Sequence, residues 1–401
     1  MTEIEQILAN VESSAPDNVR LFPFGVGDDV NTTLLDTLAE QHRGGTSYVR
    51  PHERIDEEVS GFYAKIKTPV LADLELDFGD VLVEDTYPYP LPDLFAGTQL
   101  ILTGRYRLPS SHSQGTRITL SGQVNGQRQE FVYEGAFRAA GGDANASTRF
   151  IPRLWATRKI GHLLTQIRLH GERREWVDAV VDLSVRYGII TPYTSFLIEE
   201  DDILTESGRD EAAEEYMAAP TEAPSGAPAA EKAEAEGGMR HAESVDGGAT
   251  MPPEAAHVVR HVGAKTFVLQ DGVWTDTAFD PSRMDAVQVG FGSGAYFDLL
   301  AAWPAWGAYL ALGERVVFVA DGTAYEVVEG EGESPEVVPI PTPEPGQPTV
   351  DPITPARPTP QPASNGDTPD TTDAGTDICI GAVVMVIIVL AASALWQRML
   401  G

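Results

Sequence analysis

The chain has 401 residues, with 60 Asp and Glu against 28 Lys and Arg, which gives a formal net charge of −32 at pH 7. A surface of this sign repels nucleic-acid phosphates, so a general nucleic-acid binder is excluded. Hydrophobic residues make up 42% of the chain, enough for two or three packed cores at ordinary domain sizes. The acidic excess along the whole chain is also typical of a halophilic protein that stays hydrated in concentrated salt.

The first segment, 1–67, is expected to form part of an α/β domain. In chain order its elements are a helix marked by Ile4, Ile7 and Val11, a strand at 19–24, a helix capped by Asn31, a short strand at 46–49 and a helix that begins at Ile55. This alternation implies a parallel sheet with helices on both faces. Two strands cannot bury the edges of such a sheet, so we expect half a domain, which pairs with an upstream half.

The next segment, 68–200, is expected to form an antiparallel β-sandwich followed by two helices. From Pro69 to about Phe137 the hydrophobic pattern has a period of two, and Gly, Asp and Pro turns divide it into short runs. Apolar residues at helical spacing then predict helices over 150–170 and 175–187.

Two further segments differ sharply in composition. Residues 201–254 are acidic and rich in Ala, Pro and Gly, with almost no large apolar residues, so we expect a disordered linker. Residues 255–330 predict a small α+β domain, in which Asp271-Gly272 is a hairpin-turn signal.

The C-terminal part is predicted to attach the protein to a membrane. Residues 331–377 are rich in Pro and Thr and are expected to form an extended stalk. The uncharged run from Ile378 to Leu395 spans roughly 27 Å as a helix, enough to cross a bilayer, and Trp396 and Arg398 lie where interfacial anchors belong. We therefore predict a single-pass helix over 378–396 in the cell membrane, and Arg398 favours an extracellular location for most of the chain.

A series of motifs resembles one known family. They are Phe-Gly-Val-Gly at 24–27, Val-Asn-Thr-Thr-Leu-Leu-Asp at 30–36, Tyr-Val-Arg-Pro at 48–51, Phe-Tyr-Ala-Lys-Ile at 62–66, Tyr-Pro-Tyr-Pro-Leu-Pro-Asp-Leu-Phe at 87–95, Arg-Leu-Trp-Ala-Thr-Arg-Lys-Ile-Gly at 153–161 and Tyr-Gly-Ile-Ile-Thr-Pro-Tyr-Thr-Ser at 187–195. In order and spacing they resemble the C-terminal half of proteins similar to inter-alpha-trypsin inhibitor heavy chains, which join a VIT domain to a von Willebrand factor type A domain. The resemblance implies that 1–67 is the C-terminal part of a doubly wound type A domain.

The same resemblance implies a metal site that this chain does not supply. Type A domains bind ligands through a metal held by an Asp-x-Ser-x-Ser motif and further oxygen ligands, and none of these can be assigned here. Asp182-Leu-Ser184 is an Asp-x-Ser in a predicted helix of another domain. We expect no cofactor in this chain, and a divalent metal only if the upstream half is supplied.

No catalytic or cofactor-binding residues stand out. The glycine-rich segments at 25–27 and 290–294 are expected to be a tight turn and a loop. His257 and His261 lie in a strand-like pattern that does not suit metal binding. The only cysteine, Cys379, excludes an intrachain disulfide and a cysteine-rich metal site.

One segment is locally positive. Its basic residues are Arg153, Arg158, Lys159, Arg168, Arg173 and Arg174. They could dock an acidic partner, or they could form salt bridges with acidic parts of the same protein.

These features together favour a surface-displayed binding or adhesion module with a protein ligand, and not an enzyme. Two alternatives stay open. One is a truncated accessory or structural remnant, and the other is a component of a proteolytic or hydrolytic system.

Overall fold

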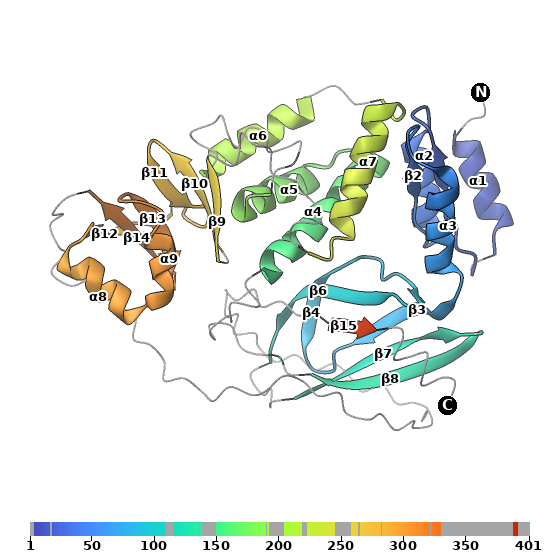
Figure 1. Ribbon diagram of the computed structural model, residues 1–401, viewed down its shortest axis with the longest axis horizontal. Helices are drawn as coiled ribbons and strands as arrows, with labels where there is room; N and C mark the ends of the chain where they lie inside the picture. Colours follow the sequence, from blue (N-terminus) through green and yellow to red (C-terminus); the bar gives the residue numbers. More distant parts are fainter. Residues whose placement is uncertain are drawn as a thin grey trace, which may run out of the picture. The chain divides into compact units, whose positions relative to one another are not determined.

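The computed structural model describes residues 4–16, 18–109, 115–135, 137, 150–189, 191, 204–218, 223–244, 258–263, 265–281, 283–320, 322–329 and 388–391. The chain divides into two compact units (Figure 1). The first consists of Met1–Ile55 and Ala146–Pro348, and the second of Asp56–Asn145 and Thr349–Gly401.

The first unit begins with alternating helices and strands. These are α1 (Ile4–Ser14), β1 (Phe24–Val26), α2 (Thr32–Gln41) and β2 (Ser47–Val49), and β1 pairs with β2 in parallel. The first strand begins later than predicted, because Pro23 has no N–H to donate to a ladder. The predicted cap is confirmed, since the Asn31 side chain accepts a hydrogen bond from the Leu34 N–H at 2.8 Å.

Four helices follow in the same unit, two of them where a disordered linker was expected. Helices α4 (Ile151–His170) and α5 (Arg174–Tyr187) lie where the sequence predicts helices. Helices α6 (Glu206–Ala218) and α7 (Ala227–Arg240) correct the expectation of disorder over 201–254. Alanine is the best helix former, and small buried side chains such as Ala230 and Ala233 let α7 pack without large apolar residues.

Close packing of α4 against α7 is concentrated at Gly161. A Cβ atom there would lie 2.5 Å from the backbone nitrogen of Arg240 and 2.7 Å from Cβ of Met239. Glycine inside a helix costs roughly 0.5–1 kcal/mol relative to alanine, so the close approach to α7 explains this residue.

We predict that Gly161→Ala lowers the free energy of unfolding by about 1–3 kcal/mol, because the added methyl group forces two backbones apart. Gly238→Ala is the matched control, since a Cβ atom at this position in α7 meets no atom within 4 Å. This control should leave stability unchanged or raise it by up to about 1 kcal/mol. Urea denaturation measures both changes, and a stabilised Gly161→Ala variant would contradict the packing described here.

The C-terminal part of the first unit is a six-stranded mixed sheet with one helical layer. The strands are β9 (Val259–Val262), β10 (Lys265–Gln270), β11 (Val273–Asp276), β12 (Ala286–Gly290), β13 (Val316–Ala320) and β14 (Thr323–Val328), in the order β12-β14-β13-β11-β10-β9. Helix α8 (Gly294–Ala302), a 3₁₀ turn (Pro304–Trp306) and α9 (Gly307–Leu310) complete the layer. Its core contains Phe267, Trp306, Phe318 and Tyr325. The predicted hairpin turn is confirmed at Asp271-Gly272, whose φ angles of 49° and 77° suit the turn between β10 and β11.

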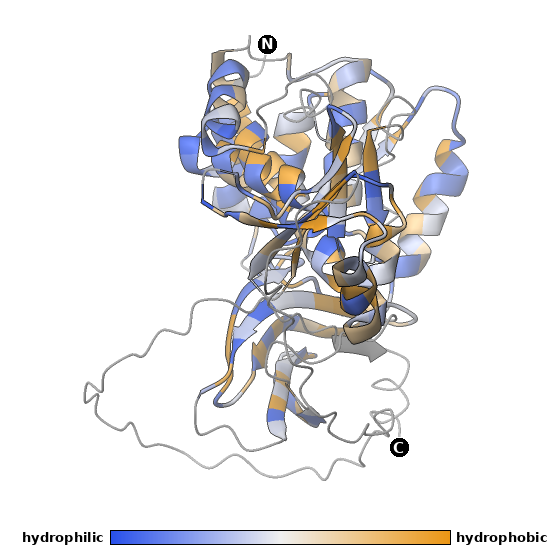
Figure 2. Ribbon diagram, turned by 90° about the vertical axis from the view of Figure 1, so that its left-hand side faces the viewer, coloured by the Kyte–Doolittle hydropathy of each residue, from blue (hydrophilic) through white to orange (hydrophobic). Residues whose placement is uncertain are grey.

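The second unit contains two antiparallel sheets and, apart from Ile55, helix α3 (Ile55–Ile66). Its strands are β3 (Pro69–Asp77), β4 (Leu82–Tyr87), β5 (Leu94–Phe95), β6 (Gln99–Arg107), β7 (Thr116–Val124) and β8 (Gln127–Gly135). One sheet has the order β5-β3-β7-β8, and the other contains β6 and β4. The strands alternate apolar and polar residues, as the hydropathy colours in Figure 2 show. Leu71, Leu94 and Leu120 are buried between them.

The membrane-spanning prediction falls mostly outside the described residues. Ile378, Leu395, Trp396 and Arg398 all lie outside them, as does the stalk at 331–377. The structure describes four residues of the predicted helix, Ile388–Ala391, as strand β15, which pairs antiparallel with β6. At these four positions the structure has a strand and not a helix, because β-branched residues such as Ile388 and Val389 favour an extended backbone and β6 supplies ladder partners. The rest of the predicted span lies outside the described residues, so the membrane-spanning segment stays a prediction. Among the residues that the structure describes, no helix is long and apolar enough to cross a membrane.

Candidate functional site

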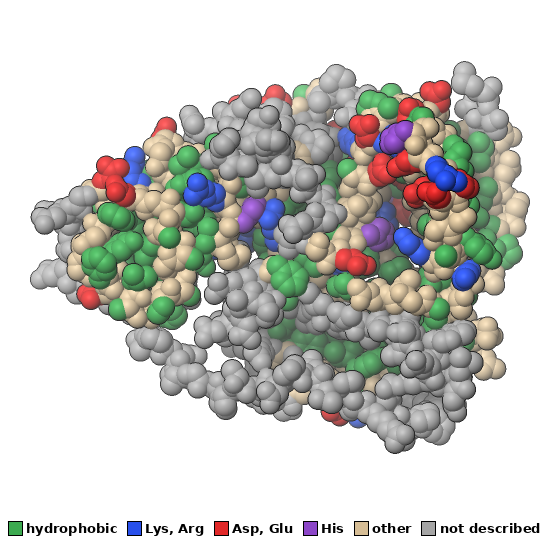
Figure 3. Space-filling view, in the orientation of Figure 1, with side chains coloured by type: hydrophobic (Ala, Val, Ile, Leu, Met, Phe, Trp, Pro, Cys, Tyr) green, Lys and Arg blue, Asp and Glu red, His purple; other side chains and the backbone are tan. Residues whose placement is uncertain are grey.

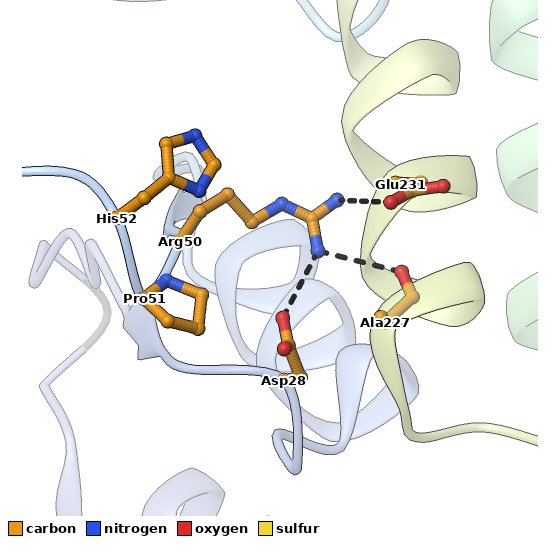
Figure 4. Close-up of a pocket in the computed structure, with 6 residues that line it drawn as sticks. All are labelled: Asp28, Arg50, Pro51, His52, Ala227 and Glu231. Atoms are coloured by element: carbon orange, nitrogen blue, oxygen red, sulfur yellow. Dashed lines mark hydrogen bonds and ion pairs between the residues drawn. The ribbon is translucent and has the colours of Figure 1, made fainter.

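A hollow of about 370 Å³ lies at the carboxyl ends of β1 and β2 (Figure 4). Asp28 follows β1, and Arg50, Pro51 and His52 follow β2 directly. Ala227 and Glu231 of α7 form the remaining wall. Parallel strands end at one edge of their sheet, and open α/β sheets bind ligands at that edge.

Arg50 lies at the bottom of this hollow and contacts residues of both walls. The residue is only 9% exposed, and its guanidinium points toward α7. Nη1 lies 3.5 Å from Asp28 Oδ1 and donates a hydrogen bond to the Ala227 carbonyl at 3.4 Å, while Nη2 lies 3.3 Å from Glu234 Oε2 and 4.0 Å from Glu231 Oε1. The three carboxylates are much more exposed than Arg50, so the rim of the hollow is acidic.

Local backbone geometry sets the two loops of the hollow. Gly27 has φ +83°, a value that favours glycine, and its N–H donates to the Val49 carbonyl at 2.9 Å. The loop after β2 closes on itself, because the Arg50 N–H donates to Glu53 Oε2 at 2.8 Å and the Glu53 N–H donates to the Arg50 carbonyl at 3.0 Å. The glycine-rich segment at 25–27 therefore makes a turn beside the hollow.

A contact far apart in sequence brings α7 to this edge. Both the N–H and the hydroxyl group of Thr32 donate hydrogen bonds to the Pro224 carbonyl, at 3.0 and 3.1 Å. Thr32 is fully buried. This contact holds the residues that precede α7 against the start of α2, so Glu231 reaches the rim.

The hollow offers binding groups and lacks a recognisable catalytic arrangement. Its acidic rim and the imidazole of His52 can form ion pairs and hydrogen bonds with a polar ligand. Within the described ranges, no group of three or more His, Cys, Asp or Glu residues is arranged to hold a metal ion.

The locally positive segment distributes its charges over α4 and α5. Arg168 forms ion pairs with Asp36 of α2 and Glu236 of α7, at 2.6 and 2.7 Å. Arg174 contacts carboxylates of α5 and α6. These two residues pair with acidic residues of the same unit, and docking of an acidic partner stays a prediction.

The other four members of this segment have different surroundings. The Arg158 guanidinium is buried and donates to the Ala242 carbonyl at 2.7 Å, and burial lowers its pKa to about 10, so it remains charged at neutral pH. Lys159 lies over the Trp155 ring and Arg173 over the Trp176 ring, at 5.2 and 4.3 Å from the ring centroids. Arg153 lies close enough to His261 to disfavour protonation of that imidazole.

Two half-buried histidines, His162 and His261, should make the stability of the first unit fall in acid. Burial, assisted by the positive charge of Arg240, lowers the pKa of His162 to about 4. Burial and Arg153 lower the pKa of His261 to about 4 as well. His257 lies outside the described residues, while the His261 ring lies 3.1 Å from the Thr266 hydroxyl group.

We expect the free energy of unfolding to fall as the pH drops from about 6.5 to about 4. In this window the unfolded chain takes up protons at both histidines and the folded chain does not. Urea denaturation at pH 7, 5.5 and 4.5 measures the effect. His162→Gln should flatten the dependence, whereas His52→Gln, at an exposed position, should leave it unchanged. An equal pH dependence in all three proteins would contradict this prediction.

Three proteins of one kind are similar in sequence to about half of this chain. Inter-alpha-trypsin inhibitor heavy chain H2 of Mus musculus is 25% identical over 208 residues, which is 50% of this chain and 22% of that protein. Heavy chain H6 of Homo sapiens is 30% identical over 213 residues, 51% of this chain and 16% of that protein. Heavy chain H3 of Homo sapiens is 24% identical over 205 residues, 48% of this chain and 22% of that protein.

These similarities support a relationship to proteins of the inter-alpha-trypsin inhibitor heavy chain type over half of the chain. The matched part spans about a fifth of the length of these curated relatives. Their names describe heavy chains of an inhibitor, and none names an enzyme. No family model matches the chain.

Proposed function

We propose that this chain is a non-catalytic protein-binding or adhesion module of the von Willebrand factor type A class. The observation that carries the proposal is the hollow at the carboxyl edge of β1 and β2, floored by Arg50 and rimmed by acidic side chains. This is the edge at which open α/β sheets bind ligands. The similarity of half the chain to inter-alpha-trypsin inhibitor heavy chains supports the same class.

The proposal places the module on the outer surface of a cell membrane. Its support is the sequence of 378–396, which combines an uncharged run long enough for a bilayer with Trp396 and Arg398 at one end. The Pro-rich segment before it would connect the folded units to the bilayer. A divalent metal belongs to the proposal only together with an upstream half of the type A domain.

A photo-cross-linking experiment tests the binding function. A photoreactive amino acid replaces His52 in the full chain, and the same amino acid at exposed Gln288 is the control. On illumination with surface proteins of the source cell, we expect a discrete protein adduct from position 52 and none from position 288. Glu231→Gln, which changes an exposed rim carboxylate, should weaken the adduct without unfolding the chain.

Two outcomes would overturn the binding proposal. Equal adducts from both positions would show that the hollow has no partner, as expected of an accessory remnant. Hydrolase activity that one point mutation in the hollow abolishes would identify an enzyme. Protease treatment of intact cells tests the location separately, because an outward-facing chain loses its folded units while internal proteins survive.

A further inference from the structure

The helical layer over the six-stranded sheet is almost free of charge. From Ala286 to Gly313 the chain contains one charged residue, Asp298, in 28 positions. Charged residues make up 22% of the whole chain, so about six would be expected in a segment of this length. In a protein with a net charge of −32, this surface lacks the groups that keep the rest hydrated.

The layer also exposes aromatic side chains. Phe297 in α8 is 58% exposed, and Phe291, in the loop between β12 and α8, is 40% exposed. The ring of Tyr296 lies between them, with its centroid 5.4 Å from each of the other two. Figure 3 shows hydrophobic side chains gathered over α8, on the left-hand side of the view.

Folding of the sheet does not account for these exposed rings. The core beneath the layer is formed by buried residues that include Leu299, Trp306 and Leu310, and neither Phe291 nor Phe297 belongs to it. Contiguous exposed apolar surface rimmed by polar residues marks a contact with a protein or a membrane.

We propose that this face, defined by Phe291, Phe297, Ala301 and Pro304, docks on the interface of an uncharged lipid bilayer. Its side chains suit that environment, because aromatic rings favour the headgroup level and the face contains no basic residue to attract anionic lipid. Directed polar groups of the kind that specify a protein partner are also few. The Ser293 hydroxyl group, for example, already caps α8 by accepting from the Tyr296 N–H.

This proposal rests on the proposed function, because the membrane anchor at 378–396 would make a weak contact between this face and the bilayer sufficient. About 50 residues separate the end of β14 from Ile378, and even a fully extended polyproline chain of that length reaches only about 150 Å. The anchor therefore keeps this face near the bilayer, and a weak interfacial affinity suffices when the second contact is intramolecular.

An environment-sensitive dye on the full chain tests the inference. Cys379→Ser removes the only cysteine, and Ala301→Cys then places the dye on the exposed face of α8. Gln288→Cys is the matched control, because Gln288 is exposed on β12 and alternates with Val287 and Val289, which face the core. With phosphatidylcholine vesicles, we expect a blue shift of the dye at position 301 and none at position 288.

Two further variants separate the inference from the anchor. Phe291→Ser with Phe297→Ser should abolish the shift at position 301 while the chain still floats with the vesicles. Val384→Arg with Ile387→Arg disables the anchor, so the shift at 301 should then require at least tenfold more lipid.

A chain that floats with the vesicles without any dye shift at position 301 overturns the docking inference. A chain that shifts at position 301 but floats equally well with the disabled anchor overturns the anchor instead. A shift at 301 and 288 alike would also overturn the docking inference, because it would show that no particular face docks.

Discussion

Replacing Arg168 with methionine should lower the free energy of unfolding by about 3–5 kcal/mol, because it removes the guanidinium that is hydrogen-bonded to two largely buried carboxylates. Arg168 joins two helices at once, with Nη2 2.6 Å from Asp36 Oδ2 and Nε 2.7 Å from Glu236 Oε2. The Glu236 side chain is only 4% exposed. Burial already raises the pKa of Glu236, and loss of Arg168 would raise that pKa further.

The pH dependence distinguishes this mechanism from a simple loss of packing. As the pH falls, Glu236 in the variant takes up a proton and ceases to be a buried charge, so part of the lost stability should return relative to the wild-type chain. Adding Glu236→Leu to Arg168→Met should restore stability at neutral pH for the same reason. Urea denaturation at pH 7 and pH 5 measures both effects.

Arg174→Met is the matched control for burial. Arg174 contacts three carboxylates, Asp178, Asp210 and Glu214, yet its side chain is 39% exposed. Water screens these pairs, so the midpoint of unfolding should hardly change. Equal destabilisation by Arg168→Met and Arg174→Met would show that the number of ion pairs, and not their burial, decides stability.

The contrast between these two arginines shows what the sequence could predict. Their positions in one basic segment are evident from the sequence, and so are the two helices that carry them. Their partners could not be predicted, because Asp36 precedes Arg168 by more than 130 residues and Glu236 lies in α7, where disorder was expected. Alanine-rich helices lack the large apolar periodicity that identifies a packed helix in a sequence.

The hollow was predictable only in part, for a similar reason. The order of strands and helices predicts a parallel pair in which Asp28 and Arg50 follow neighbouring strands, so both residues belong at one edge of the sheet. The opposite wall comes from Ala227 and Glu231, and the contact between Thr32 and Pro224 that positions it spans 192 residues. Features that depend on neighbouring residues alone were predicted correctly. Asn31 caps a helix and Asp271-Gly272 forms a turn, and neither depends on a contact far away in the sequence.

Asp276→Ala should also lower the free energy of unfolding by about 3–5 kcal/mol, because this carboxylate organises the centre of the six-stranded sheet. Asp276 is 1% exposed and ends β11. Its Oδ2 lies 2.6 Å from Lys265 Nζ and accepts from the Val319 N–H at 3.0 Å, and its Oδ1 accepts from the Ala278 N–H at 3.0 Å. Removing it leaves two backbone donors and one cation without their acceptor.

Lys265→Met and Asp276→Asn test which of these contacts dominates. Lys265 is more exposed than Asp276, and its removal leaves the two backbone hydrogen bonds to Asp276 in place, so it should cost less than Asp276→Ala. Asp276→Asn keeps the shape and one acceptor oxygen and should fall between the two. Urea denaturation followed by tryptophan emission reports on this sheet, because Trp274 and Trp306 belong to its core. If Lys265→Met proved as damaging as Asp276→Ala, the ion pair would be the dominant contact and the backbone hydrogen bonds to Asp276 would contribute little.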